Sequence, residues 1–457
     1  MPLASADPRR LTKPELLKAG LLSGWFFLTI TILWLLKTIR SASLLAHLGA
    51  SELPYVRFGA IVAVAVVVVV YSRVVNRLSR LAVGVGANLL FSAVVAIFSV
   101  SLKLGGEALG SQRWFVWAVF ILVDVYSTVM VGIFWTYTND VCSRAEADRI
   151  YGPIGLGGIL GGVVGGAVVD TFIETLGPTN VLMLCAIIGV ACAGIVVAGE
   201  RILKPPRREP ADDGGALDAA LEGAREIAKS PYLLAMVGIV VCYEFAAALT
   251  DFVINVIIER SFQGEVAIAQ MFGRLGWIVS GAALASQLVV VPLLLPRKRA
   301  ALLVPPVAMG LATVGLAIVP TVAAAVALAA ADRGLNYSLQ QVTKETLYVP
   351  LSDAQKYKAK ALIDMFVDRT GKVLSSLALM AILAVEGVSI RVTLAAALGA
   401  LAIWAVCANM LGQAYGRLTA KRRVLAEQHA ALATVPSTVN APARASRPGP
   451  DSPDPGG

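Results

Sequence analysis

Long apolar segments recur along the whole sequence, and each has about the length that an α-helix needs to cross a lipid bilayer. A spanning helix takes about 20 mostly apolar residues. Hydrophobic residues make up 57% of the 457 residues and charged residues only 15%, which is far more apolar material than a soluble core needs. The sequence therefore predicts an all-α membrane protein with twelve transmembrane helices, at residues 16–38, 53–75, 81–102, 114–138, 151–173, 179–199, 231–258, 272–295, 300–319, 321–343, 360–385 and 390–414.

The length of these segments argues against two other interpretations. A membrane β-barrel would need short segments of alternating polarity, which the sequence does not contain. The first apolar run, from Leu16 to Leu36, is too long for the apolar part of a signal peptide. We therefore expect it to be retained as the first span.

A proline-rich, charged stretch, KPPRREPADDGG at residues 204–215, separates six predicted spans from six. We expect a cytoplasmic N-terminus, a six-helix bundle, a cytoplasmic linker, a second six-helix bundle and a basic, then Pro/Ser-rich disordered tail, at residues 1–15, 16–199, 200–230, 231–416 and 417–457. Two six-helix bundles resemble the plan of the major facilitator superfamily, in which the substrate site lies between the halves. The expected fold is therefore major facilitator-like.

The net charge of +9 comes from basic residues that gather on one side of this pattern. The clusters lie at residues 9–13, 73–80, 201–208, 297–299, 356–360 and 421–423. Because basic loops stay on the cytoplasmic side, both termini are expected in the cytoplasm, with the protein in the cell (inner) membrane. This placement also argues against nucleic acid as a partner.

Ten ionisable side chains lie inside the predicted spans. They are Lys37, Asp124, Glu244, Asp251, Asp332, Arg333, Asp364, Asp368, Arg369 and Lys372. Each would cost roughly 2.5 to 3.5 kcal/mol at the centre of the bilayer. Ten lipid-facing charges would exceed the net stability of about 5 to 15 kcal/mol that is typical of proteins. Individual residues can be explained as structural pairs or as charges at span ends, but together they favour a hydrated central cavity and a transport path.

Spacing groups these residues on shared helical faces, because residues three or four apart lie on one side of a helix. The groups are Asp364, Asp368 and Lys372; Glu244, Asp251 and Asn255; Asp332, Asn336, Gln340 and Lys344; and Lys37 with Arg40. In the first group an acid precedes a base by one turn, which is the favourable order for an ion pair.

Glycines recur in the fifth span, GLGGILGGVVGGAVV at residues 155–169. Gly157, Gly161 and Gly165 share one face, a spacing of small residues that allows helices to approach closely. A phosphate-binding loop is excluded because no Gly-Lys-Ser or Gly-Lys-Thr ending follows.

The segment NYSLQQVTKETLYVPLSDAQKYKAKALIDMFVDRTGK, residues 336–372, resembles the nucleotide transporter family, the ATP/ADP antiporters of plastids and intracellular bacteria. The family's motifs stand here as Tyr337 and Ser338, Thr343 to Glu345, Tyr348 to Leu351, Lys356 to Asp364, and Arg369 to Lys372. Residues 35–58 and 134–158 are similar to the family as well. The resemblance implies nucleotide exchange served by Lys37 or Arg40, Asp124, Asp251 and Lys372. Asn255 and Gln341 depart from the family, which carries a lysine and an aspartate there.

The sequence thus predicts a secondary transporter that exchanges a small anion, ATP or ADP under the resemblance, by alternating access. Lysine and arginine supply donors suited to phosphate or carboxylate, and Asp124 and Asp251 would pair with these cations in the empty carrier. The predicted substrate-binding residues are Lys37, Arg40, Asp124, Asp251, Asn255, Asn336, Gln340, Asp368, Arg369 and Lys372.

Two alternatives stay open. One is a proton-coupled, facilitator-type carrier of a non-nucleotide substrate, in which Asp251 or Asp368 titrates. The other is a transport-inactive membrane anchor or signalling protein on the same fold. No nucleophile motif, histidine cluster or metal-ligand spacing is present, so we expect neither enzyme activity nor a cofactor or metal. The lipid bilayer is the expected environment; the oligomeric state is not determined, and a monomer is consistent with the sequence.

Overall fold

The computed structural model describes residues 12–75, 78–203, 225, 227–348, 351, 362–363 and 367–433, and every regular element within them is helical. This confirms the all-α prediction. The helices are α1 (Lys13–His47), η1 (Ala50–Glu52), α2 (Leu53–Val75), α3 (Arg80–Gly110), α4 (Arg113–Val141), α5 (Arg144–Leu203), α7 (Pro231–Ser261), α8 (Glu265–Ala285), η2 (Ser286–Val290), α9 (Val291–Leu294), α10 (Lys298–Ile318), α11 (Val322–Leu335), η3 (Asn336–Gln340), α12 (Gln341–Leu347), α14 (Asp368–Glu386) and α15 (Ile390–Ala433). Among the described residues, nine helical segments are long and apolar enough to cross a membrane.

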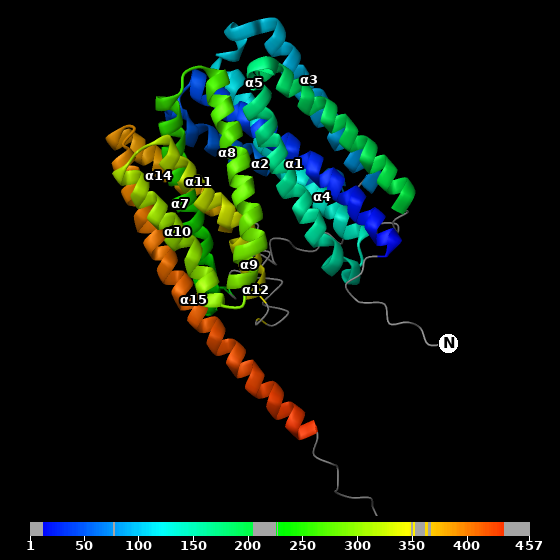
Figure 1. Cartoon of the computed structure of the whole chain (residues 1–457), viewed down its shortest axis with the longest axis vertical. Coiled ribbons are helices and arrows are strands. Elements are labelled where there is room, and N and C mark those ends of the chain that lie inside the picture. The colour runs from blue at the N-terminus through cyan, green and yellow to red at the C-terminus, as the bar shows by residue number, and fades with distance from the viewer. Residues whose placement is uncertain are drawn as a thin grey trace, which may run out of the picture.

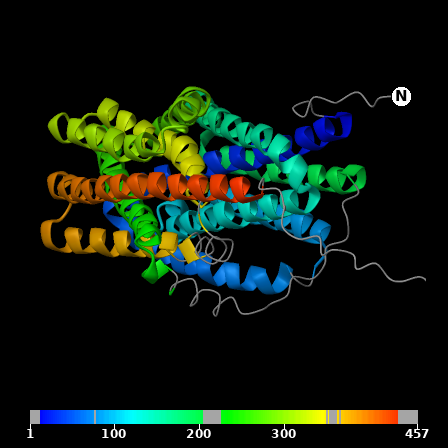
Figure 2. The same ribbon diagram turned by 90° about the horizontal axis from the view of Figure 1, so that it is seen from below.

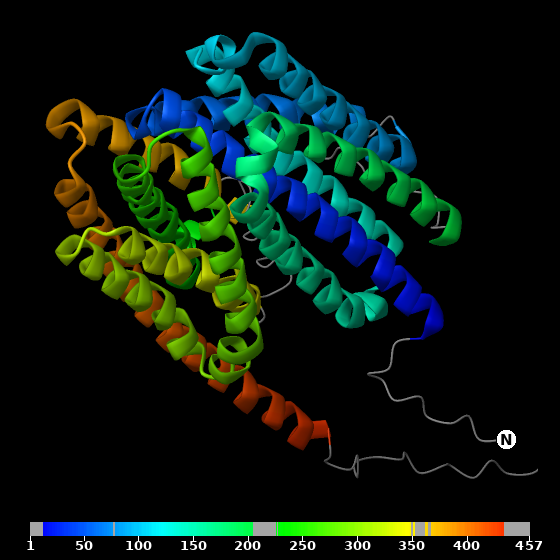
Figure 3. The same ribbon diagram turned by 45° about the horizontal axis from the view of Figure 1, so that its top comes forward.

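The helices form two groups, which we call the first half, α1 to α5, and the second half, α7 to α15. Figure 1 shows the first half in blue to blue-green on the right and most of the second half on the left. Figure 3 shows the same division with the top tilted forward. In the view of Figure 2, α15 lies between α10 and α14, both of which it contacts. In Figure 1, α1 begins at the right of the molecule, and α15 extends below the other helices.

Helix α5 changes direction at Gly177, where the backbone leaves the helical conformation with φ of 69°. Glycine adopts this left-handed region without the steric cost that other residues meet. Pro178 follows, and proline is well suited to the first turn of a new helix. The predicted spans at 151–173 and 179–199 therefore form two helical segments joined by a sharp turn rather than by a loop.

The glycine pattern of α5 produces the close packing that the sequence predicts. A methyl group on Gly161 would lie 2.4 Å from the carbonyl oxygen of Phe27 in α1, so the two backbones are in direct contact. On the neighbouring face, a methyl group on Gly166 would lie 2.5 Å from the backbone nitrogen of Trp277 in α8. The same helix thus joins α1 within the first half and α8 across the two halves.

Polar contacts reinforce the junction of the halves in the middle of α8 and at the end of α7. The carboxylate of Asp170 on α5 accepts a 2.9 Å hydrogen bond from Trp277 Nε1 and lies 3.3 Å from Arg274 Nη2. The backbone nitrogen of Ala50 donates to Glu259 Oε2 at 3.0 Å, which joins η1 to the end of α7. The halves are therefore held together at the end that carries the α1–α2 and α7–α8 connections.

Two short π-helical segments, η2 and η3, lie side by side in the second half. The buried hydroxyls of Ser286 and Ser338 form a 2.7 Å hydrogen bond between them. A π-turn takes more residues than an α-turn, so side chains on either side of it no longer follow a four-residue spacing. The predicted stripe through Asp332 and Gln340 is consequently not a single continuous face.

Candidate functional site

A polar cavity of about 150 Å³ lies between the two halves. The first half contributes side chains from α1, α2 and α4, and the second half contributes them from α7, α8 and α11. The polar lining residues are Lys37, Thr38, Arg40, Ser41, Arg57, Asp251, Asn255, Arg333 and Tyr337, and the aromatic ones include Trp34, Phe120 and Phe272.

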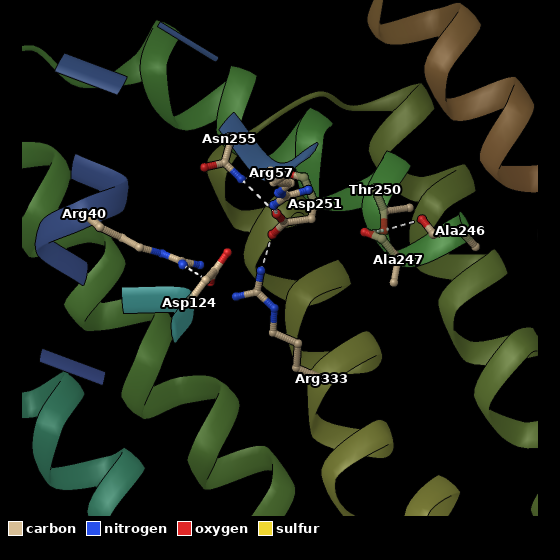
Figure 4. Close-up of polar contacts among 9 residues, drawn as sticks. All are labelled: Arg40, Arg57, Asp124, Ala246, Ala247, Thr250, Asp251, Asn255 and Arg333. Carbon is tan, nitrogen blue, oxygen red and sulfur yellow. Dashed lines mark hydrogen bonds and ion pairs between the residues drawn. The ribbon is translucent and has the colours of Figure 1, made fainter. Parts of the chain in front are cut away.

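Asp251 is the centre of the charge network in this cavity. Its two carboxylate oxygens form ion pairs with Arg57 of α2 and Arg333 of α11, and its side chain is only 14% exposed. Figure 4 shows Asp251 between the two guanidinium groups. Asn255, one turn further along α7, donates to the Asp251 carbonyl at 2.7 Å and to its Oδ2 at 3.3 Å. Since Arg57 belongs to the first half and Asp251 to the second, this ion pair bridges the halves.

A second pair, between Arg40 and Asp124, lies within the first half beside the Asp251 network (Figure 4). Asp124 does not line the cavity itself and reaches it through Arg40. The guanidinium carbon of Arg40 lies 4.1 Å from the centre of the Phe120 ring. Such stacking favours a cation through the ring's negative face. Arg40 is thus oriented by a carboxylate and by an aromatic ring.

Lys37 differs from the three arginines, because its ammonium group has no ion-pair partner among the described residues. Its Nζ lies 5.8 Å from the centre of the Trp34 ring. The described residues place four cations at the cavity, Lys37, Arg40, Arg57 and Arg333, against two carboxylates, Asp124 and Asp251. The difference, four minus two, leaves an excess of two positive charges, which attracts an anion.

A separate charged cluster joins α7 to α14. Lys372 Nζ lies 2.8 Å from Asp368 Oδ2 and 4.0 Å from Glu244 Oε2. The predicted pairing of Asp368 with Lys372 one turn later is confirmed. Gly371 allows this approach, because a methyl group there would lie 3.0 Å from Glu244 Cβ.

The predicted site residues are thus distributed over several places. Lys37, Arg40, Asp251 and Asn255 line the cavity, and Asp124 reaches it through Arg40. Asp368 and Lys372 belong to the α7–α14 cluster, and half-buried Arg369 does not line the cavity.

The two predicted site residues from η3 lie outside the polar cavity. Gln340 lines a smaller, mostly apolar cavity of about 30 Å³ inside the second half. Half-buried Asn336 lines neither of these two cavities. Asp364 and the lysine-rich segment at 352–361 lie outside the described residues.

Sequence reasoning missed Arg57 and Tyr337 as cavity residues, and it noted Arg333 only as a charge within a span. Arg57 carried a usable signal, because it is a charged residue inside the predicted span 53–75. The only sequence signal for Tyr337 was its position in the family motif.

The sequence model of the TLC ATP/ADP transporter family matches residues 100–316 and 297–415. A protein named ADP,ATP carrier protein 1 from Chlamydia muridarum (strain MoPn / Nigg) is 25% identical over 465 aligned positions, covering 84% of this chain and 85% of that protein. Its namesake from Chlamydia trachomatis serovar D is 24% identical, covering 83% and 85%.

Solved structures show a shared fold at low sequence identity. A bacterial homologue of the iron transporter ferroportin, in its inward-facing state, has a TM-score of 0.61 at 13% identity, covering 88% of this chain and 99% of that one. A bacterial homologue of the human lysosomal transporter Spinster, inward-facing and unoccupied, has a TM-score of 0.57 at 14% identity, covering 90% and 99%. The chain therefore shares its helical fold with these structures. Because the family match extends over well more than half of the sequence, the chain belongs to the TLC ATP/ADP transporter family.

Proposed function

We propose that this protein exchanges nucleotides of the ATP and ADP type across the cell membrane by alternating access. The observation that carries this proposal is the cavity between the halves, where four cations face two carboxylates. Phosphate groups suit such a site, since guanidinium groups bind them in bidentate geometry. The names of the relatives, ADP,ATP carrier protein 1, support a nucleotide as the substrate.

Obligatory exchange follows from the way the cations are neutralised. Asp251 neutralises Arg57 and Arg333 in the absence of substrate, and a bound phosphate would compete with it for the same guanidinium groups. Lys37, which has no ion-pair partner among the described residues, would meet the anion first. A carrier whose substrate has left must re-form these pairs before it can reorient. The cations are therefore neutralised by Asp251 in the empty carrier and by the phosphate in the loaded carrier.

The substrate-binding set under this proposal is Lys37, Arg40, Asp251 and Asn255, with Asp124 acting through Arg40. The cavity lining adds Arg57, Arg333 and Tyr337. Asn336, Gln340, Asp368, Arg369 and Lys372 would then serve roles other than direct contact in this conformation.

We further propose twelve spans in two bundles, at residues 16–199 and 231–416. The kink at Gly177 adds one span to the nine apolar segments. The continuous α11–η3–α12 segment and α14, both of which carry charges, would add two more. The positive-inside rule then places both termini and the linker at 200–230 in the cytoplasm.

Reconstitution of the purified chain into liposomes tests the function. Uptake of labelled ATP into vesicles preloaded with ADP should greatly exceed uptake into empty vesicles. Lys37→Gln should weaken uptake, whereas Lys103→Gln, the same change at an exposed position on α3, should leave it unchanged. Equal uptake with and without internal ADP would argue against exchange. An absence of nucleotide uptake would favour a carrier of another substrate or a transport-inactive protein.

A further inference from the structure

A cluster of acidic side chains lies outside the cation-rich cavity, where α7, α11 and α14 meet. We call Glu244, Asp332, Asp368 and Lys372 the acidic cluster. Lys372 lies between two carboxylates, 2.8 Å from Asp368 and 4.0 Å from Glu244. Asp332 of α11 acts electrostatically on Glu244 and is only 7% exposed, and its Oδ1 has no hydrogen-bond partner. The described carboxylates here do not form a set that could hold a metal ion.

Negative charge exceeds positive charge in the acidic cluster. Three carboxylates face one ammonium group, which forms ion pairs with two of them, Asp368 and Glu244. Arg333, next to Asp332 in α11, is bound to Asp251 in the cavity. Arg369 of α14 forms no ion pair with a described residue, but its charge acts on Asp368 and Lys372, so three carboxylates face two cations. The other neighbours are the phenols of Tyr243 and Tyr337. Two carboxylates that share one site inside a membrane cannot both remain ionised at low cost, so the arrangement favours an added proton.

Of the two carboxylates that share Lys372, Glu244 is the better suited to take this proton. Asp368 has the closer contact with Lys372 and lies one helical turn before it, which stabilises its ionised form. Glu244 is at the limit of ion-pair distance from the same ammonium, and its side chain is 15% exposed. Asp251, by contrast, lies between two guanidinium groups, which already neutralise its carboxylate.

The acidic cluster is close enough to the cavity to respond to the charge of the substrate. Glu244 and Asp251 lie seven residues apart on α7, which is about 10 Å along the helix axis. At that distance, one additional negative charge in the cavity strengthens proton binding at Glu244 by roughly tenfold. The side chains of Asp368 and Lys372 are 28% and 42% exposed, so the acidic cluster is not sealed inside the protein.

We propose that the acidic cluster binds one proton, on Glu244, together with the more highly charged of the two exchanged nucleotides. This inference rests on the proposed nucleotide exchange. ATP carries about one more negative charge than ADP, so a proton that travels with ATP equalises the charge of the two loaded carriers. The proton binds the Glu244 carboxylate on the side where ATP binds and dissociates where ATP is released. ATP-for-ADP exchange is then electroneutral and moves one proton per cycle.

The test uses the full chain in liposomes that contain ADP and an entrapped pH-sensitive dye. External ATP should acidify the interior as it exchanges with ADP, whereas external ADP should exchange without any pH change. Glu244→Gln should abolish the acidification while ADP/ADP exchange continues, which also reports that the variant is folded. Glu386→Gln, the same change at an exposed position at the end of α14, should behave like the unaltered protein.

A second measurement gives the stoichiometry. With one proton per ATP, an interior one pH unit more alkaline should raise the internal ATP-to-ADP ratio at equilibrium about tenfold. In Glu244→Gln this dependence on pH should disappear, and a dependence on membrane potential should replace it. Active ATP/ADP exchange without proton movement, or acidification that survives in Glu244→Gln, would overturn the proton site alone. Absence of all ADP exchange in the unaltered protein would overturn the proposed function and the proton site with it.

Discussion

Replacing Gly166 with alanine should weaken the contact that joins the two halves. Gly166 lies on α5 where this helix meets α8. A methyl group there would lie 2.5 Å from the backbone nitrogen of Trp277 and 2.7 Å from the carbonyl oxygen of Gly273. Both neighbours are backbone atoms, so no side chain can rotate away to make room. The helices must separate, and the conformation in which this end of the carrier is closed loses stability.

The size of the effect follows from the cost of overpacking. Inserting a methyl group into a well-packed contact costs about 1 to 3 kcal/mol. Because each 1.4 kcal/mol is a factor of ten in an equilibrium constant, the closed conformation should lose roughly fivefold to 150-fold in population relative to the alternative. Gly155→Ala is the matched control, because a methyl group at this position on the same helix would meet nothing within 4 Å.

Distances between spin labels across the junction measure this shift. Ser51→Cys in η1 and Gln263→Cys in the α7–α8 connection supply exposed labelling sites on opposite halves. The five native cysteines, Cys142, Cys185, Cys192, Cys242 and Cys407, are first replaced. Gly166→Ala should increase the population of long distances, and Gly155→Ala should leave the distribution unchanged. An unchanged distribution in Gly166→Ala would refute the view that backbone contact between α5 and α8 holds this end closed.

Three further predictions concern the charged cavity and the π-helical pair. Asp251→Asn leaves two partly buried guanidinium groups without their carboxylate and should cost up to about 3 to 5 kcal/mol, seen as a lower midpoint of thermal unfolding in detergent. An unaltered midpoint would contradict the network. Lys37→Gln removes a charge-assisted contact worth about 1.5 to 3 kcal/mol and should raise the KM for the nucleotide roughly tenfold to 150-fold. An unchanged KM would show that Lys37 does not bind the nucleotide. Ser338→Ala leaves the hydroxyl of Ser286 without this hydrogen-bond partner and should lower the free energy of unfolding by about 1 to 3 kcal/mol. The double variant, with alanine at positions 286 and 338, should recover part of this loss. Equal losses for the single and double variants would argue against the hydrogen bond.

Local patterns were sufficient to predict the class of the molecule and the close packing of α5. Spans follow from apolar length, because backbone groups in lipid must satisfy their hydrogen bonds within a helix. The contact of Gly161 with α1 follows from a four-residue spacing that any straight α-helix preserves. The same argument predicted the pair of Asp368 and Lys372, since both belong to one helix.

Partners on different helices could not be predicted in this way. Asp251 pairs with Arg57, 194 residues earlier in the chain, and with Arg333, 82 residues later. Which charges meet depends on how each helix is rotated and where it lies along its neighbour. The π-helical segment at η3 adds a second reason, because it shifts the side chains that follow it and directs Gln340 into a different cavity.

The sequence by itself determined that the chain is helical and carries segments long and apolar enough to span a membrane, since both follow from the solvent and from the period of the helix. Only the tertiary structure decided that the charges divide into a cation-rich cavity and a separate acidic cluster. That division depends on packing between segments far apart in the chain, which no local period encodes.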